Sequence, residues 1–351
     1  MGLSISIAFL LLQIPLQRLA FLLMKPESVI VPHAIKYFYI CFWGAPAMLA
    51  QYSLTGWFIG VQDTRSPMWI AILQNLINIA ASTFLVFICG LHIEGVALGT
   101  VIAQWSGCLM AIIILLKKYG TRARDIMISP TNVTMPSRQF FSVNGNLFLR
   151  TLCMIAVMVY FTSAGSRMGN TILSANSLLM QFFILYSYFM DGLANAAEAL
   201  SGQYAGAGDK EMLRRTVSTL FAWGLTISVA FSFFYVFLGD TLLRLFTNQE
   251  SIILVARSYL SWSYAIPLIA MAAVVWDGIF IGTTQTRGML YSTFTAMIVF
   301  FTLWLLCRHS LLNHALWLAF ICYLFTRGFV QTIIFKLITS HKNTHETFLF
   351  I

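Results

Sequence analysis

Long apolar segments alternate with short polar turns over the whole length of this chain. A window of about 20 mainly apolar residues is long enough to cross a bilayer as a helix. By that measure the sequence predicts ten membrane spans, at 3–24, 34–60, 68–90, 94–116, 141–165, 171–203, 215–238, 257–282, 288–307 and 313–338. The first is interpreted as a membrane helix rather than a signal peptide, because it has no basic start and no small-residue cleavage site. The pattern predicts an all-α polytopic membrane protein with no separate soluble domain.

One stretch of the chain occurs twice. GWFIGVQDTR at 56–65 returns as GIFIGTTQTR at 278–287, 222 positions later, with six identities in ten and no gap. Each copy is expected to end a helix that carries a proline, Pro46 in the first and Pro267 in the second. We expect packing and hinge roles for these prolines and for the glycines of the two copies, Gly56, Gly60, Gly278 and Gly282.

The spacing of the copies predicts the domain organisation. Six predicted spans separate them, an even number, so both copies point the same way and the repeats are parallel. The second copy has more chain in front of it than the first. This difference predicts a parent architecture of two six-helix lobes, of which this chain contains four helices of the first lobe and six of the second. The expected parts are an N-terminal lobe at 1–118, a cytoplasmic linker at 119–140, a C-terminal lobe at 141–338 and a cytoplasmic tail at 339–351. A wrong start site, a fragment and a real truncation would each explain the shorter first lobe.

Composition and charge fit this picture. Hydrophobic residues make up 59% of the chain and charged residues 9%, with a net charge of +9. Most of the basic residues fall in short loops on one side of the predicted helices, which places those loops and the C-terminus in the cytoplasm. The expected location is the inner (plasma) membrane, and the positive charge reports topology rather than nucleic-acid binding. The expected partners are a small molecule, a coupling cation and the lipid bilayer, and the expected state is a monomer.

The chain offers no pattern for catalysis or metal binding. Neither HExxH nor GxSxG is present, and the six cysteines have no metal-ligand spacing. We therefore expect a protein that is not an enzyme and has no cofactor other than H⁺ or Na⁺ as a coupling ion.

Charged residues inside the predicted spans are the main functional candidates, because an ionised group at membrane depth is costly without a partner or a purpose. Asp191 and Glu198 lie on one helix face with Asn195, at spacings of i, i+4 and i+7. Glu198 is expected to pair with Arg150. An interhelical hydrogen-bond seam is the structural alternative for this face.

Depth along the helices predicts that Asp191, Asp277 and Arg327 meet inside the second lobe. Arg150 and Arg327 supply two guanidiniums. The three carboxylates are those of Asp191, Glu198 and Asp277, so one carboxylate is left without a partner. We assign the coupling ion to Asp277, because it precedes Gly278 on the proline-bearing helix; simple pairing with Arg327 is the alternative. The uncharged groups that could line the cavity, or else join helices, are Gln51, Asn75, Asn78, Asn176 and Asn195.

Several ordered motifs resemble the MATE multidrug exporters, and within them the DNA-damage-inducible F (DinF) branch: GAPAMLAQYSLTGWFIGVQDTRSPM, GVALGTVIAQ, FMDGLANAAEALSGQYAGAGD, WDGIFIGTTQTR and NHALWLAF. The resemblance covers essentially the whole chain. It implies two six-helix lobes, alternating access, and export of cationic or amphipathic compounds in exchange for H⁺ or Na⁺. It also implies an acidic coupling residue on the helix of Asp277 in some branches. The alternatives are a flippase for lipid-linked sugars or other amphipathic lipids, and a truncated remnant that does not transport.

Overall fold

The computed structural model describes residues 12–15, 17–18, 31–128 and 137–340. Every regular element in these ranges is helical, and eight helices are long and apolar enough to cross a membrane. The prediction of an all-α, multi-pass membrane protein is confirmed. The predicted first span at 3–24 lies almost wholly outside the described residues.

The chain divides into two compact units, Met1–Val133 and Thr134–Ile351. The division falls inside the segment predicted as a linker, 119–140. Residues 119–128 nevertheless continue one helix, and 137–140 begin the next, so part of this segment is helical.

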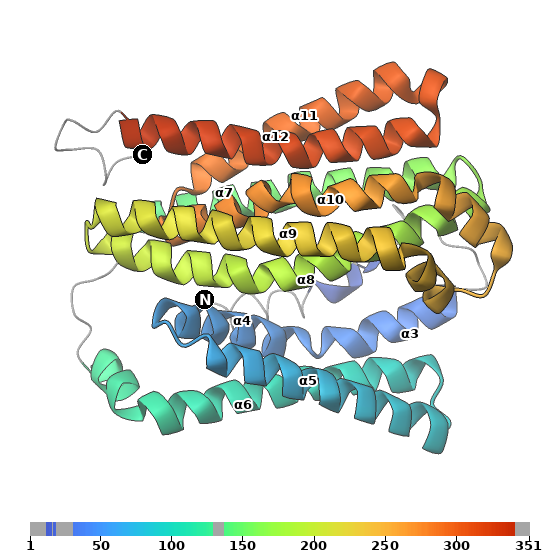
Figure 1. Cartoon of the computed structure of the whole chain (residues 1–351). Coiled ribbons are helices and arrows are strands. Elements are labelled where there is room, and N and C mark those ends of the chain that lie inside the picture. Colours follow the sequence, from blue (N-terminus) through green and yellow to red (C-terminus); the bar gives the residue numbers. More distant parts are fainter. Residues whose placement is uncertain (1–11, 16, 19–30, 129–136, 341–351) are drawn as a thin grey trace. The chain divides into compact units, whose positions relative to one another are not determined.

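The first unit contains five described helices (Figure 1), α3 (Val31–Phe42), α4 (Ala45–Gly60), α5 (Arg65–Thr83), a π-helix η1 (Phe84–Ile88) and α6 (Ile93–Ile128). The long helix α6 packs against α3, α4 and α5. A small apolar core of Phe58, Ile70 and Ala111 joins α4, α5 and α6.

The predicted span 34–60 is wrong as a single helix. The chain turns at Trp43 and Gly44, so that α3 and α4 are separate, and Pro46 lies in the first turn of α4. Proline is favoured there because the first amides of a helix have no intrahelical acceptor to lose. Pro267 differs, since it lies inside the continuous helix α10.

The second unit contains six helices, α7 (Ser137–Ser166), α8 (Asn170–Gly206), α9 (Lys210–Phe246), α10 (Glu250–Gly282), α11 (Thr286–Leu311) and α12 (Asn313–Ser340). Helix α10 is central: it packs against α8, α9 and α12 (Figure 1), and half of its apolar window is buried. The carboxylate of Asp209 accepts a hydrogen bond of 2.9 Å from the amide of Met212 and so caps the start of α9.

The two copies of the repeated stretch adopt the same backbone turn. The amide of Asp63 donates to the carbonyl of Phe58 at 2.8 Å, and the amide of Gln285 donates to that of Phe280 at 2.8 Å. Gln62 and Thr284 both have a positive φ, at 63° and 58°. A left-handed residue followed by such a six-to-one hydrogen bond is the usual way to end a helix. The repeat seen in the sequence is therefore a repeat of local structure.

The side chains at the two turns differ. Asp63 is buried and accepts hydrogen bonds from the hydroxyls of Ser66 (2.5 Å) and Tyr119 (3.0 Å) and from the ammonium of Lys118 (2.9 Å). Burial alone would raise the pKa of the Asp63 carboxyl, but these hydrogen bonds outweigh it and lower the pKa to about 2. Asp63 thus ties the turn after α4 to α6, which Gln285 does not do in the second copy.

The glycines of the second copy are packing residues. A Cβ at Gly278 would lie 2.3 Å from the carbonyl oxygen of Ala194, and one at Gly282 would lie 2.2 Å from that of Glu198. Helices α8 and α10 can approach this closely only because both positions lack a side chain. At Gly56, the equivalent of Gly278, no other described atom lies within 4 Å of such a Cβ, and the same holds at Gly60.

Candidate functional site

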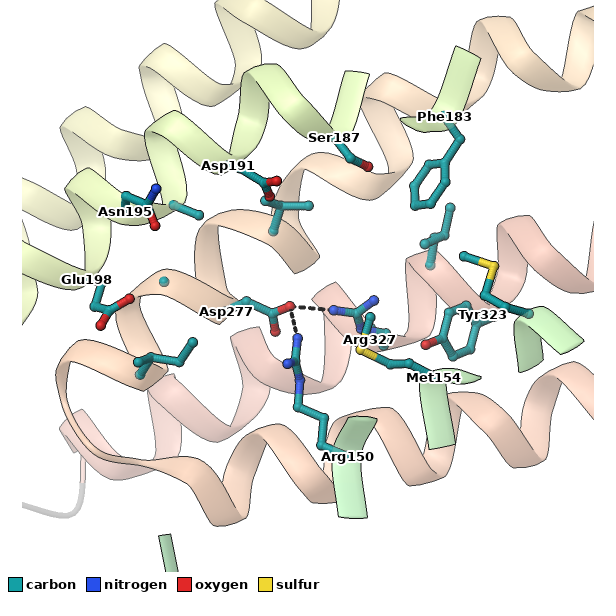
Figure 2. A pocket seen from close by; sticks show the side chains of 16 residues that line it. Arg150, Met154, Phe183, Ser187, Asp191, Asn195, Glu198, Asp277, Tyr323 and Arg327 are labelled. Atoms are coloured by element: carbon teal, nitrogen blue, oxygen red, sulfur yellow. Dashed lines mark hydrogen bonds and ion pairs between the residues drawn. The ribbon is translucent and has the colours of Figure 1, made fainter. Parts of the chain in front are cut away.

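A cavity of about 480 Å³ lies in the second unit, between α7, α8, α10 and α12 (Figure 2). All five charged residues predicted from the sequence line it: Arg150, Asp191, Glu198, Asp277 and Arg327. The prediction that charged groups from distant parts of the sequence meet inside this lobe is confirmed. Apolar side chains form much of the remaining wall, among them Met154, Met158, Phe183, Val274, Ile281 and Leu324.

Asp277 is the centre of an ionic cluster. Arg150 and Arg327 both donate through Nη2 to its Oδ2 atom, the latter at 2.5 Å, and Gln331 donates to Oδ1 at 2.8 Å. The cluster is largely withdrawn from solvent, with side-chain exposures of 14% for Asp277 and 5% for Arg327. Ion pairs in such surroundings are strong but costly to desolvate, so removing one partner leaves an expensive uncompensated charge.

The predicted pairing of these charges is wrong in two respects. Arg150 pairs with Asp277 and not with Glu198, and Asp277 is the best-partnered carboxylate of the three rather than the one left over. The alternative, in which Asp277 pairs with Arg327, is confirmed. The prediction compared depths along the helix axes, but depth does not say which faces of neighbouring helices meet. Helix α10 presents Asp277 to α7 and α12 together, whereas Glu198 lies on α8.

Asp191 and Glu198 are the carboxylates without partners. Within the described part of the chain, neither forms a hydrogen bond or an ion pair, although both line the cavity. Figure 2 shows Asp191, Asn195 and Glu198 in a row along α8. Seven residues at 1.5 Å each separate the two carboxylates by roughly 10 Å along the helix. The predicted common face of these three residues is confirmed, and it presents two separate acidic positions to the cavity.

Two further residues of the site lie on α12 and were not predicted from the sequence. Gln331 hydrogen-bonds Asp277 and is fully buried, and the hydroxyl of Tyr323 is buried at the cavity without a partner. Tyr323, Arg327 and Gln331 are spaced by four, so all three lie on one face of α12. This spacing around the intramembrane arginine was the available signal.

The uncharged candidates divide into one cavity residue and four that bond elsewhere. Asn195 lines the cavity. Asn176 does not: it is buried, and its amide pairs with that of Asn313 through two hydrogen bonds of 2.8 and 2.9 Å while also accepting from Trp317 at 2.9 Å. A cavity-lining role for Asn176 is wrong, because its amide oxygen and nitrogen are both used in joining α8 to α12.

The other three lie in the first unit. Gln51 donates to Gln74 at 2.5 Å, Asn78 donates to Thr100 at 3.4 Å, and Asn75 donates to the carbonyl of Ala71 in its own helix at 2.9 Å. Two of them therefore join helices. This outcome matches the alternative in which uncharged polar groups hold a membrane bundle together.

Hydroxyl groups support α10 around its proline. Tyr186 donates to the carbonyl of Pro267 and Ser232 donates to the carbonyl of Tyr264, each at 2.9 Å. Proline removes one backbone hydrogen bond of its helix, the one that would reach the carbonyl of Ser263 four residues earlier. The two hydroxyls donate to carbonyls in the same turn, as side chains of neighbouring helices do at prolines in membrane helices. The backbone near Pro267 is thus held by α8 and α9.

Comparison with known proteins gives consistent matches. The model of the MatE family matches residues 1–84 and 146–304, more than half of the chain. The chain is 31% identical over 318 residues to DNA damage-inducible protein F of Escherichia coli (strain K12), covering 91% of this chain and 69% of that protein. It is 26% identical over 269 residues to Protein DETOXIFICATION 43 of Arabidopsis thaliana, covering 76% of this chain and 50% of the plant protein. The chain thus spans about half the length of that relative.

Solved structures show the same fold. A crystal structure of MATE in the bent conformation has a TM-score of 0.80 at 17% identity, covering 97% of this chain and 76% of that one. An outward-facing multidrug resistance MATE family transporter of the MOP superfamily also has a TM-score of 0.80 at 17% identity, covering 98% of this chain and 78% of the other.

Proposed function

Because this chain belongs to the MatE family, we propose that it acts as a secondary transporter that exports small amphipathic compounds from the cytoplasm by alternating access. The observation that carries the proposal is the cavity of about 480 Å³, which combines apolar walls with two unpartnered carboxylates. Drug-sized ligands bind in cavities of about 300–1,000 Å³ that are mainly apolar and hold a few placed polar groups.

In this proposal Asp191 and Glu198 bind cations. An ionised carboxylate in a membrane-embedded cavity is unfavourable alone, so it gains free energy from a proton, a sodium ion or a positively charged group of the substrate. Because the two carboxylates lie roughly 10 Å apart along α8, one can hold the coupling cation while the other meets the substrate. The grounds for assigning the coupling ion to Asp277 fall away, because its charge is already balanced by Arg150 and Arg327.

The remaining parts of the proposal follow from topology. The loops rich in lysine and arginine and the C-terminus lie in the cytoplasm, the protein resides in the inner membrane, and one copy suffices because the cavity lies within one unit. A lipid flippase is the alternative. A strongly basic cavity would favour that alternative. This cavity holds two arginines against three carboxylates, which argues for the exporter.

Dye accumulation in bacterial cells tests the proposal. Cells that express the chain are expected to accumulate less ethidium than cells with an empty vector, and Asp191→Asn or Glu198→Gln should remove the difference. Glu211→Gln is the matched control, because Glu211 is exposed and pairs with Arg215 outside the cavity. In proteoliposomes, an imposed pH gradient and an imposed sodium gradient identify the coupling ion.

Two results would contradict the proposal. Unchanged ethidium accumulation with protein present in the membrane would reject drug export, and a change in lipid export in the same cells would favour the flippase. Full activity of both carboxylate variants would reject the assigned roles of Asp191 and Glu198.

A further inference from the structure

The cluster around Asp277 carries more positive than negative charge. Two guanidiniums share one carboxylate, and both donate to the same oxygen, Oδ2. No other ion pair reaches Arg150 or Arg327 within the described residues. Arginine stays protonated in proteins, so one positive charge is left uncompensated where side-chain exposure is only 14% for Arg150 and 5% for Arg327. A buried net charge of this kind calls for a counter-ion.

Most of the hydrogen-bond donors of this cluster are unused. Each guanidinium has five N–H groups, and each makes a single hydrogen bond within the described residues, through Nη2 to Asp277. The Nε atoms of Arg150 and Arg327 are buried without a partner, and so is the hydroxyl of Tyr323, whose ring centroid lies 5.7 Å from the guanidinium carbon of Arg327. All three residues line the cavity.

The acidic residues of α8 do not neutralise this cluster directly. Neither Asp191 nor Glu198 forms an ion pair with Arg150 or Arg327 in the described structure. Figure 2 shows Glu198 and Asn195 on the side of Asp277 away from both guanidiniums. The cavity is therefore lined by two carboxylates from α8 and by two guanidiniums from α7 and α12, with no ion pair between the two sets in the described part of the chain.

We propose that Arg150, Arg327 and Tyr323 form an anion subsite of the substrate cavity, which binds a carboxylate carried by an amphipathic zwitterion. Planar guanidiniums match a carboxylate through paired N–H groups, and the Tyr323 hydroxyl can donate a further hydrogen bond. The apolar body of the ligand packs against Met154 and Phe183, and its cationic group meets the carboxylates of α8. This inference rests on the proposed function, because it names the substrate class of the same cavity.

Two matched dyes test the subsite. Rhodamine 110 carries a carboxylate and a delocalised cation, and rhodamine 123 is its methyl ester, which keeps the cation and loses the anion. We would measure the binding of each to the purified full chain in detergent by fluorescence polarisation. A hydrogen-bonded charge pair in a desolvated site corresponds to about tenfold to a hundredfold in affinity, so rhodamine 110 is expected to bind at least tenfold more tightly.

Variants test which residues produce the preference for rhodamine 110 over rhodamine 123. Arg150→Gln leaves one guanidinium for one carboxylate, so the affinity ratio of the two dyes should fall to about one through weaker binding of rhodamine 110. Arg257→Gln is the control, because Arg257 pairs with Asp240 outside the cavity, and it should keep the wild-type ratio.

The outcomes separate the two proposals. If neither dye binds, the substrate cavity of the proposed function is rejected. If both dyes bind wild-type protein with similar affinity, or if Arg150→Gln keeps the preference, the cavity stands and the anion subsite is overturned. Should Arg150→Gln fail to fold, the wild-type ratio decides alone, since a ratio below about ten rejects the subsite and a ratio of ten or more supports it.

Discussion

The contact between α8 and α10 makes Gly278→Ala a sharp test of the structure. A Cβ at Gly278 would lie 2.3 Å from the carbonyl oxygen of Ala194 and 2.9 Å from the Cβ of Ala197. The oxygen belongs to the backbone of a long helix and cannot rotate away. To reach the 3.4 Å of an ordinary contact, α10 must move by roughly 1 Å from α8.

Two opposing terms set the size of the effect. Overpacking of this kind costs about 1–3 kcal/mol. Alanine also favours the helix over glycine by about 0.5–1 kcal/mol, which offsets part of that cost. We therefore expect Gly278→Ala to lower the free energy of unfolding by about 1–2 kcal/mol, or Tm by several degrees at about 2–4 °C per kcal/mol. Transport should fall as well, because the shift moves Asp277 relative to Arg150 and Arg327.

The repeat supplies the matched control. Gly56 is the equivalent of Gly278, and a Cβ there meets no described atom within 4 Å. Gly56→Ala should therefore leave Tm unchanged or slightly raised. Both variants would be purified in the same detergent, heated in steps and assayed by fluorescence-detected size-exclusion chromatography. Equal Tm values for Gly278→Ala and wild type would refute the close approach of α8 and α10.

Four further perturbations probe other parts of the chain. Asn176→Leu should lower the free energy of unfolding by about 1–3 kcal/mol by leaving the Asn313 amide unsatisfied, and the double replacement of both asparagines by leucine should cost less than the sum of the two single changes. Asp277→Asn should destabilise the protein by about 3–5 kcal/mol, because two buried guanidiniums lose their counter-ion; normal thermal stability of this variant would contradict the cluster. Asp63→Asn should cost about 1–3 kcal/mol at pH 7. Since the pKa of Asp63 is about 2 when folded and 3.8 when unperturbed, this difference should stay constant above pH 4 and shrink as the pH falls toward 2, as urea titrations at several pH values would show. Pro267→Ala should slow dye efflux more than it lowers the amount of protein in the membrane, and equal losses would assign the proline to folding alone.

Local and one-dimensional features of this protein could be predicted from its sequence. The positions of the membrane helices follow from apolar length, because a span must cover the bilayer, and eight of the nine predicted spans from 34 to 338 match candidate membrane helices of the described chain, whereas 34–60 is divided into α3 and α4. The repeated stretch predicted two matching helix ends, which the paired left-handed residues Gln62 and Thr284 confirm. The break at Gly44 escaped detection, because a short turn between two apolar helices leaves the hydrophobic run intact.

The sequence allowed a prediction of which charged residues line the cavity, but not of which residues form ion pairs with one another. Charges inside apolar spans are few, and their cost in a membrane draws them together, so Asp191, Asp277 and Arg327 could be placed in one cavity. Sequence gives each residue a height along its helix, at 1.5 Å per residue. It does not give the direction in which that residue faces its neighbours.

Helix packing decided the rest. Gly278 and Gly282 bring α10 against α8, and in this packing Asp277 meets the arginines of α7 and α12, whereas the carboxylates of α8 meet neither. The same geometry joins Asn176 to Asn313 across 137 positions of sequence. The sequence by itself determined which groups lie at membrane depth, and only the tertiary structure decided which of them are neutralised, since pairing depends on the rotation and closest approach of helices that are distant in the chain.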